Sequence, residues 1–536
     1  MIRINIKEEY FWKKHTTDNI ILWLKGYLFN KTTKQLINDF SPLNINDIKD
    51  YLIKLDGQFA LVAQTENWTM MAVDKIRSIP LFYAKNNNNW SIDSQAPSLV
   101  KKANLRELNK DAILSFKMSG YTVGEDTLYQ DLNSLISGQC VVFENSKNPQ
   151  KIQYYQYQPW EVINKNNEEY QQELKKVTLK ILQKTIDSLN GRQVIIPLSA
   201  GNDSRLIVSG LKYLGYKNVK CYSYGIKGNF EAKIAKIIAQ KLGYEFKFIP
   251  LTIREERKFY QSQKFKDYLD FADNCLAIQY FQSLSTIPRL KSWIAKDAVF
   301  INGGTGDFIS GGHIYGDLQK DNSQLLKKQR LAIIFNETIK KHFSLWGSLK
   351  TKNNLANIKQ QLKNEIPIKL TTCDKDHGIY EYSEFINRQS KYVISGQRAY
   401  EFYGYEWRLP LWDDEYLRFW QQVPLELKAK QKLYNSMLKT ENWAGVWGDD
   451  IPVNKKNIRP IWIIPLRFIA KLFFALLGKK GKEWWHQFEI NIFYYFMDVT
   501  RMICIASYSK VIKSIFQKPK NHVSWQVYYY LEDKDI

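Results

Sequence analysis

Val194-Ile-Ile-Pro-Leu-Ser-Ala-Gly-Asn-Asp-Ser-Arg205 is the stretch that decides the fold, because an apolar run leads directly into a loop of small, polar residues. Residues 194–198 predict a buried strand of a parallel sheet. The apolar residues within 206–211 predict the inner face of a helix that follows the loop. Small side chains at residues 199–201 would let backbone N–H groups and the helix N-terminus approach an anion closely. The stretch therefore predicts a strand, a loop and a helix that cradle the phosphates of a nucleotide.

The carboxylate within this loop, Asp203, indicates a magnesium ligand, because a carboxylate suits a hard cation and repels a phosphate. The order S-x-G-x-D-S differs from the G-x-x-x-x-G-K-S of the P-loop in kinases and GTPases. The stretch resembles the PP-loop of ATP pyrophosphatases, S-G-G-x-D-S, which grips the pyrophosphate released when a substrate is adenylated. Ala200 replaces the first glycine of that pattern. The alternative is an ordinary turn in which Asp203 and Ser204 only cap the helix.

Length and composition predict a globular protein of two or three domains. The chain has 536 residues, 44% of them hydrophobic and 14% aromatic, which is too long for one core and sufficient for globular packing. The net charge of +23 indicates an anionic environment, but the lysines are dispersed, and a solvated basic surface is the alternative. The five cysteines are scattered and the sequence starts without an apolar signal core, which predicts a reduced, cytoplasmic protein. The six histidines are also dispersed, so no zinc or iron site can be recognised from the sequence.

Two kinds of pattern follow one another along the chain. Up to about residue 160 the sequence predicts a β-rich domain with strands at 20–28, 58–64, 69–73 and 139–143. A 3.6-residue period from Glu168 predicts a helix, after which strands and helices alternate, with strands at 194–198, 219–224, 246–251 and 298–302. This alternation predicts a doubly wound parallel sheet that binds ligands at the carboxyl ends of its strands. We expect domains at 1–160 and 165–450 and a basic, aromatic extension at 451–536.

A second glycine-dense loop follows the last of these strands, Asn302-Gly-Gly-Thr-Gly-Asp-Phe-Ile-Ser-Gly-Gly-His313. Its carboxylate, Asp307, would lie on the same sheet edge as Asp203, so the two could share a magnesium ion. The loop resembles the S-G-E-G-x-D-E-x-x-G-G-Y segment of the asparagine synthetase family, and Asp307 and three of its glycines match. Gly304 and Phe308 stand where the family has two glutamates, the first of which is implicated in amide formation.

A third segment with the same resemblance is Glu406-Trp-Arg-Leu-Pro-Leu-Trp-Asp413, which is similar to the E-A-R-x-P-F-L-D of that family. Beyond it, Lys432 falls where the family has a lysine that contacts an ATP phosphate. A positive charge there would stabilise the phosphorus centre as pyrophosphate departs. Lys430 aligns nearly as well, and the alternative is that Lys432 is one of many surface lysines.

The first domain resembles the N-terminal-nucleophile glutaminase domain of the same family, also called a class II glutamine amidotransferase. The matches are at residues 55–62, 74–83, 120–128 and 137–138. The resemblance implies an α/β protein, in which an α+β sandwich precedes a doubly wound PP-loop ATP pyrophosphatase domain.

The residues that a glutaminase needs are missing from this first domain. The family uses a cysteine exposed as residue 2, whose α-amino group serves as the base, but this chain has Ile2. The family segment N-G-E-I-Y-N orients glutamine and its oxyanion, and here it is Lys25-Gly-Tyr-Leu-Phe-Asn30. Lys25 and Tyr27 cannot take those roles, so we predict that this domain does not hydrolyse glutamine.

The stretch at residues 461–477 is apolar but is interrupted by Pro465, Arg467 and Lys471, which argues against a membrane span. A helix that starts near Pro465 would place Arg467 and Lys471 on one face and apolar residues on the other. Two explanations remain open. The helix either packs on the second domain or lies in a membrane interface beside anionic lipids.

The resemblance implies an ATP-dependent ligase that adenylates a carboxylate and lets a nitrogen nucleophile displace AMP, with ATP and Mg²⁺ as cofactors. Asp203, Asp307 and Lys432 are the expected catalytic residues, and the two aspartates would hold the metal. The residues expected to bind ATP and pyrophosphate are Leu198, Ser199, Ala200, Gly201, Asn202, Ser204, Arg205, Tyr224, Gly225, Gly303 and Gly304.

Several partners and two rival functions follow from this interpretation. The acceptor would be aspartate, a sugar acid or another small carboxylate, and the nitrogen would come from ammonia, a separate glutaminase or a substrate amine. A second copy of the chain is a further candidate partner. One rival is a PP-loop enzyme that modifies tRNA, for which the basic charge is apt, although a glutaminase-like domain argues against a nucleic-acid partner. The other is a non-catalytic, ATP-binding or scaffolding descendant.

Overall fold

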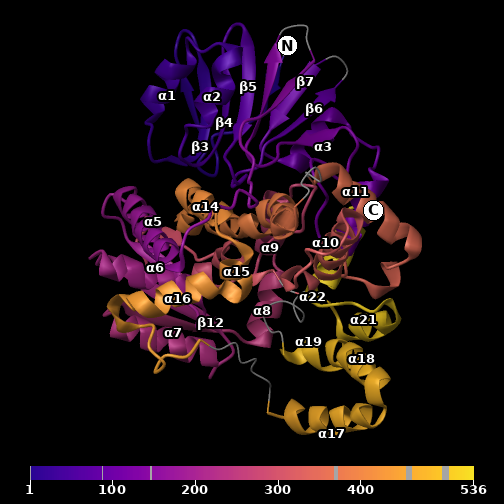
Figure 1. The fold of residues 1–536 in the computed structure, drawn as a ribbon. Coiled ribbons are helices and arrows are strands. Elements are labelled where there is room, and N and C mark those ends of the chain that lie inside the picture. The colour runs from indigo at the N-terminus through magenta and orange to yellow at the C-terminus, as the bar shows by residue number, and fades with distance from the viewer. Residues whose placement is uncertain are drawn as a thin grey trace.

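Two β-sheets that face each other form the N-terminal part of the computed structural model, which describes residues 2–86, 89–144, 148–314, 316–366, 372–453, 461–497 and 506–536 (Figure 1). The larger sheet is antiparallel, and its strands in spatial order are β10 (Gln150–Gln153), β9 (Gln139–Glu144), β5 (Trp68–Val73), β4 (Gly57–Gln64), β3 (Ile21–Leu28) and β2 (Lys13–Thr16). The smaller sheet comprises β1 (Arg3–Ile4), β7 (Asn89–Asp93), β6 (Phe82–Asn86) and β8 (Leu132–Ser134). The four strands expected in this region are confirmed as β3, β4, β5 and β9.

Helices cover the outer faces of both sheets, so that this part has four layers (Figure 1). Because side chains alternate along a strand, Leu61 of β4 packs beneath α1 (Thr33–Phe40) and α2 (Ile48–Leu52), whereas Val62 faces the smaller sheet. On the outer face of the smaller sheet, Phe82 packs in one cluster with Leu99 of α3 (Ala96–Ala103). The helix α4 (Lys110–Ser119) follows α3. This arrangement confirms the expected α+β sandwich.

Five parallel strands form the centre of the following part of the chain. In spatial order they are β13 (Glu245–Pro250), β12 (Val219–Gly225), β11 (Val194–Pro197), β14 (Val299–Ile301) and β15 (Glu406–Arg408). The helices α5 (Asn167–Asp187), α6 (Asn202–Tyr213) and α7 (Phe230–Lys241) precede or connect the first three strands. The doubly wound parallel sheet is therefore confirmed. Since β12 and β13 lie on one side of β11 and β14 and β15 on the other, the topological switch falls between β11 and β14.

Most of the remaining helices lie between or after these strands. Those before β15 are α8 (Ile253–Tyr260), α9 (Gln263–Ala272), α10 (Lys327–His342), α11 (Lys352–Glu365), α12 (Asp376–Glu384) and α13 (Arg398–Phe402). Those after it are α14 (Asp414–Gln421), α15 (Leu425–Lys428) and α16 (Lys432–Glu441). The wide π-helical turns of Phe385–Val393 continue α12, and Phe385 stacks on Tyr157 with ring centroids 4.5 Å apart. The helical layer therefore reaches from the parallel sheet to the N-terminal part.

The C-terminal extension comprises α17 (Ile463–Leu476), α18 (Gly478–Phe488), α19 (Tyr494–Met497), α21 (Tyr508–Lys513) and α22 (His522–Asp533). Its residues 454–460 and 498–505 lie outside the described ranges. The helix α22 returns to the body, where Tyr530 meets Phe116 with ring centroids 4.9 Å apart. The helix α17 projects from the body at the bottom of Figure 1 and packs on α18. Its apolar side chains are largely exposed, so of the two explanations left open by the sequence, packing on the second domain is wrong for that face. None of the helices in the described ranges is long and apolar enough to cross a bilayer.

Candidate active site

The loops that follow β11 and β14 lie at the topological switch, which is where open α/β sheets bind ligands. In the first loop the Ser199 N–H donates to the Ser204 Oγ at 3.1 Å, and the Gly201 N–H donates to the Ser199 Oγ at 3.2 Å. Gly201 is the N-cap residue of α6 and has no side chain, so within the described residues no side-chain hydrogen bond caps this helix. The loop thus leads into a helix N-terminus of the kind that binds phosphate.

The second loop packs directly against the first. The Asp307 N–H donates to the Asp203 Oδ2 at 3.0 Å. A Cβ atom on Gly306 would lie 2.4 Å from the Asp203 carboxyl carbon, and one on Gly303 would lie 2.6 Å from the Ser204 nitrogen. Such distances are too short for any side chain, so the glycines of this loop are required for the contact between the two loops.

A strained residue links the second loop to the helical layer. Thr305 has a φ of +85°, which a β-branched residue rarely adopts. Its hydroxyl donates to the Gln389 Oε1 at 3.0 Å, and the Gln389 Nε2 donates to the Glu384 Oε1 at 2.9 Å. Strain of this kind persists where surrounding contacts enforce it, which is typical of functional sites.

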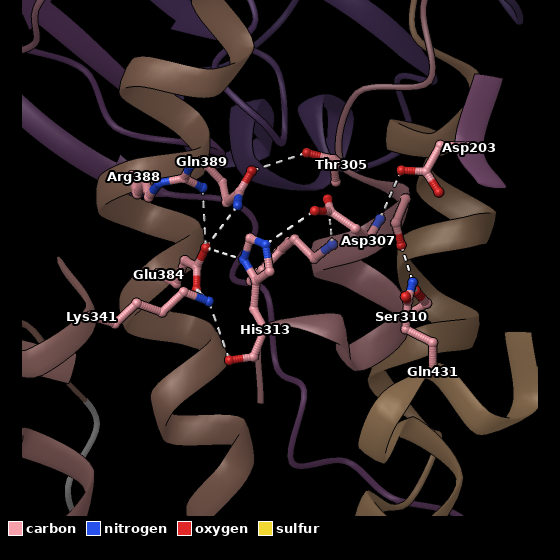
Figure 2. Close-up of polar contacts among 12 residues, drawn as sticks. Asp203, Thr305, Asp307, Ser310, His313, Lys341, Glu384, Arg388, Gln389 and Gln431 are labelled. Carbon is pink, nitrogen blue, oxygen red and sulfur yellow. Dashed lines mark hydrogen bonds and ion pairs between the residues drawn. The ribbon is translucent and has the colours of Figure 1, made fainter. Parts of the chain in front are cut away.

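Glu384 is the buried centre of a polar cluster at the end of α12 (Figure 2). Its carboxylate meets the His313 Nδ1 at 2.6 Å and the His342 Nε2 at 3.0 Å. The Arg388 guanidinium lies 3.4 Å away and the Lys341 Nζ 3.6 Å away. A fully buried carboxylate is thereby surrounded by potential cations, which compensate its loss of hydration.

These contacts set the charge of each member of the cluster. Burial by itself would raise the pKa of Glu384, but His313 and His342 outweigh burial and hold this pKa well below its usual range. Burial lowers the pKa of His342 to about 4 and that of Lys341 to about 8. Burial also acts to lower the pKa of His313, but the charge of Glu384 and the bond to Asp307 raise it overall. His342 is therefore a neutral donor near pH 7, and Glu384 is charged.

His313 joins this buried cluster to the second loop. Its Nε2 lies 3.2 Å from the Asp307 Oδ2, while the Asp307 Oδ1 accepts from the Phe308 N–H at 2.9 Å. The Asp307 side chain is 51% exposed. Figure 2 shows His313 between the two carboxylates, with Asp203 on the other side of Asp307. The network therefore extends from a buried glutamate to a carboxylate at the surface of the site.

The two aspartates fit a magnesium ion that arrives with a nucleotide. Mg²⁺ in proteins usually takes one or two carboxylates and completes its shell with phosphate oxygens and waters. The Asp203 carboxylate accepts from the Asp307 N–H and the Tyr434 hydroxyl, and carboxylate oxygens keep capacity for a further ligand. No group of three or more His, Cys, Asp or Glu within the described ranges is arranged to hold a metal unaided.

The start of α16 is tied to both loops. The Tyr434 hydroxyl donates to the Asp203 Oδ1 at 3.0 Å, and the Gln431 Nε2 donates to the Ser310 Oγ at 2.7 Å. Lys430 and Gln431 both have positive φ, +56° and +58°, so the turn before α16 is strained. Lys430 and Lys432 flank Gln431 and are both exposed. The structure therefore places both candidate lysines at the rim of the site.

Arg205 does not point into the site. Its guanidinium is buried and donates to the backbone oxygens of Ala200, Val446, Ile451 and Pro452. The shortest of these distances, to Ile451, is 2.9 Å. These bonds tie the first loop to the segment after α16. The contact with pyrophosphate that the sequence indicated for Arg205 is therefore replaced by a structural role.

The other expected binding residues lie on the sheet edge or in the two loops. Leu198 and Ala200 are buried, and the Leu198 N–H donates to the Tyr222 oxygen at 2.8 Å. The Asn202 Nδ2 donates to the Asn435 Oδ1 at 2.8 Å, and the Gly304 N–H donates to the Asn302 Oδ1 at 3.0 Å. Tyr224 and Gly225 end β12 beside this rim. Leu198 and Ala200 thus contribute shape, and the N–H groups of Leu198, Ser199 and Gly201 are bonded within the protein.

The sequence did not indicate five residues that hold this site together, namely Thr305, His313, Glu384, Gln431 and Tyr434. The strain at Thr305 and the strained turn before α16 are invisible to local patterns. Glu384 lies on a helix remote in the chain from both loops. A signal existed only for His313, which closes the second glycine loop.

The segment that aligns with the glutamine-binding residues contacts the other domain. Lys25 is buried, and its Nζ lies 2.8 Å from the Glu401 Oε2. The Tyr27 hydroxyl accepts from the Leu409 N–H at 3.3 Å, and the Arg408 guanidinium carbon lies 4.0 Å from the Tyr27 ring centroid. A cavity of about 200 Å³ remains beside these residues. Among the described residues that line this cavity there is no cysteine.

A sandwich followed by a parallel sheet with two glycine loops at its switch defines an amidotransferase-like protein with a doubly wound α/β domain. Residues 46–156 match the glutamine amidotransferase domain family, and residues 189–441 match the asparagine synthase family. These matches together take up about two thirds of the chain, which belongs to the asparagine synthetase family. Comparison with curated proteins gave no match.

Two solved structures resemble parts of the chain. The first is the allosteric regulatory enzyme of purine biosynthesis, with 13% identity, 44% of this chain and 61% of that chain covered, and a TM-score of 0.16. The second is glutamine phosphoribosylpyrophosphate amidotransferase from B. subtilis, complexed with ADP and GMP, with 12% identity, coverage of 55% and 64%, and a TM-score of 0.16. The chain spans less than two thirds of the length of either protein.

Proposed function

We propose that this protein is an ATP-dependent carbon–nitrogen ligase that adenylates a carboxylate and lets ammonia or an amine displace AMP. The observation that carries the proposal is the contact of the two loops at the sheet switch, where the Asp307 N–H donates to Asp203 at 3.0 Å. This contact sets a phosphate-binding turn beside a second carboxylate at the ligand-binding edge. Membership of the asparagine synthetase family supports the same chemistry.

The reaction comprises two substitutions. In the first, a carboxylate oxygen of the acceptor attacks the α-phosphorus of ATP, and the bond from that phosphorus to the bridging oxygen breaks, so that pyrophosphate leaves with the electron pair. In the second, the nitrogen attacks the acyl carbon, the bond from that carbon to the AMP oxygen breaks, and the nitrogen loses a proton. The protein needs mainly to position the reactants and to offset the phosphate charge.

The residues of the two loops divide these tasks. Ser199, Gly201 and Ser204 hold the pyrophosphate through the turn and the helix N-terminus. Asp203 and Asp307 hold Mg²⁺, which when bound neutralises phosphate charge and polarises the phosphorus centre. Lys432 at the start of α16 adds a positive charge at the rim.

The nitrogen comes from free ammonia, a separate glutaminase or an amine on the substrate, because Ile2 stands in place of the family's cysteine and Lys25 and Tyr27 replace its substrate-orienting residues. The burial of Lys25 against Glu401 supports this part of the proposal, because breaking a buried ion pair to admit glutamine would cost a large free energy. Incubation of the purified protein with glutamine should release no glutamate. A glutamate signal that depends on the protein would contradict the proposed loss of the glutaminase.

The acceptor is a small carboxylate. Aspartate is the family substrate, and the exchange of two family glutamates at Gly304 and Phe308 extends the candidates to sugar acids and other small acids. With no carboxylate at either position, the nucleophile is already basic or another residue takes its proton.

The test is pyrophosphate release with Mg²⁺, ATP, ammonium and a panel of carboxylic acids. We expect one acid to stimulate release and Asp203→Ala to lower it by at least about a hundredfold, because the variant loses the link between the loops and a metal ligand. Asp297→Ala is the matched control, since Asp297 is exposed just before β14, at the opposite sheet edge. If no acid stimulates release and the protein does not bind ATP, a non-catalytic role replaces this proposal.

A further inference from the structure

The helix α17 has one face that packs on the protein and a wider face that does not. Ile463 is fully buried, and Phe474 packs between Trp485 and Phe488 of α18, with ring centroids 5.9 Å and 5.1 Å away. Arg467 is on the same side and pairs with Glu489. At 100° per residue these three positions share one face of the helix.

The opposite face of α17 is apolar throughout. Phe468 and Phe473 are both 62% exposed and Leu476 is 86% exposed. Ile464, Leu466, Ile469 and Leu472 on the same side are also more than half exposed. An apolar patch of this continuity is rare on a monomeric soluble protein and marks an interaction surface.

The helices α17 and α18 pack tightly against each other. The helices α17 and α18 join at Gly478, which has a φ of +63°, and a Cβ on Gly481 would lie 1.9 Å from the Phe474 oxygen. This close approach fixes α17 against α18. The apolar face is thus the outer side of a packed hairpin, which projects from the body (Figure 1).

The charges around this face identify its partner. Lys471 borders it, and Lys479, Lys480 and Lys482 follow in the first turns of α18, all exposed. Within the described residues, these four lysines make no ion pair, and Glu483 is the one acidic residue among positions 461–488.

Two tryptophans add to this pattern. Trp462 and Trp484 are half exposed near the two ends of the region, and tryptophan anchors proteins at membrane interfaces. A basic rim around a charge-free apolar face complements an anionic bilayer.

The length of the helix is consistent with a position along the membrane surface. Its 14 residues extend about 21 Å, which is shorter than the hydrocarbon core of a bilayer. A protein partner would ordinarily present polar groups to a mixed surface, whereas the exposed side of α17 between Ile464 and Leu476 offers no side-chain donor or acceptor apart from Lys471 at its border.

We propose that α17 lies in the interface of an anionic lipid bilayer, with Phe468, Phe473 and Leu476 in the acyl region and the lysines of α18 at the headgroups. This contact holds the protein on a membrane while its parallel-sheet domain remains in water. It is independent of the ligase reaction, since the residues involved are remote from the two loops of the active site.

Flotation of the full-length protein with vesicles tests this proposal. Two compositions are needed, phosphatidylcholine alone and phosphatidylcholine mixed with phosphatidylglycerol. We expect binding to the anionic vesicles, weakened by salt, and a loss of at least tenfold in Phe468→Asp/Phe473→Asp. Lys479→Gln/Lys480→Gln/Lys482→Gln should weaken anionic binding by about fivefold for each lysine removed.

The matched control is Leu326→Asp/Phe516→Asp, which changes two apolar residues outside α17 that are more exposed than Phe468 and Phe473, and it should leave binding unchanged. Circular dichroism of every variant verifies folding, and pyrophosphate release without lipid should be equal in all of them. Equal flotation of the α17 variant and the control would overturn the proposal. So would a lipid-free dimer that Phe468→Asp/Phe473→Asp converts to a monomer, because the face would then bind a second copy.

Discussion

The loop at residues 199–204 and the segment at residues 25–27 align with two substrate-binding segments of one family, but their polar groups have opposite fates. In the loop, Ser199 and Ser204 bond each other and the backbone, and the helix N-terminus beyond them has no side-chain cap within the described residues. In the segment, Lys25 is paired with Glu401 inside the domain interface. The loop thus ends in a helix N-terminus whose N–H groups are offered to a ligand, whereas the segment satisfies its charge within the protein.

The same contrast separates two buried glutamates. Glu401 accepts from Lys25 at 2.8 Å, Arg398 at 3.0 Å and Trp407 at 2.9 Å, and these three partners are themselves buried. Glu384 instead reaches the half-exposed Asp307 through His313. The Glu401 network, which we call the closed network, has all its partners buried in the interface, whereas the Glu384 network, the open network, extends to an exposed carboxylate at the site. We therefore expect the closed network to affect stability alone and the open network to affect both stability and activity.

The largest effect is expected for Glu384→Gln. The substitution keeps the shape but leaves His313, Arg388 and Lys341 without their counter-charge, which should lower the free energy of unfolding by about 3–5 kcal/mol. It also removes the support of His313 and therefore of Asp307, so pyrophosphate release should fall by at least about a hundredfold. Urea denaturation and initial rates measure the two effects. Activity within tenfold of the wild-type protein would show that this network is not part of the site.

Glu401→Gln is the matched substitution in the closed network. The loss of the charge strands Lys25 and Arg398, and we expect a comparable loss of about 3–5 kcal/mol in stability. Pyrophosphate release by the folded fraction should stay within about twofold, since Glu401 faces the domain interface. A loss of activity as large as that of Glu384→Gln would remove the distinction between the two networks.

The parts of this fold that depend on short stretches were predictable from the sequence. The strand, loop and helix of residues 194–213 follow from an apolar run, three small residues and a 3.6-residue period, and Asp203 and Asp307 lie where sheet topology places them. Arg205 was misassigned, because its four backbone acceptors include a segment far along the chain. Glu384 and the left-handed Thr305 depend on contacts between remote segments, about which local periodicity carries no information. The tail pattern predicted a helix but could not tell which face the protein covers.

The pH dependence of stability examines the open network more closely. Burial lowers the pKa of His342 to about 4, whereas an unfolded histidine titrates near pH 6.5. Between these values the unfolded chain binds one more proton than the folded protein, so stability falls as the pH drops from 6.5 to 4. His342→Gln should remove up to about 3 kcal/mol of that fall. Denaturation of both proteins at several pH values measures the difference, and parallel curves would mean that His342 is not buried as a neutral group.

The smallest effect concerns the two rim lysines, which the sequence could not separate. Lys430 lies in the strained turn and Lys432 begins α16, between residues that bond Ser310 and Asp203. Because α16 is fixed to both loops, Lys432 is held on a rigid element. We therefore expect Lys432→Gln to raise the KM for ATP about tenfold. This is the effect of losing one charge-assisted hydrogen bond. Lys430→Gln should change it by about twofold or less, as should Lys439→Gln, a control further along the same helix. The reverse order would assign the phosphate contact to Lys430 and would mean that the strained turn presents this lysine to the nucleotide.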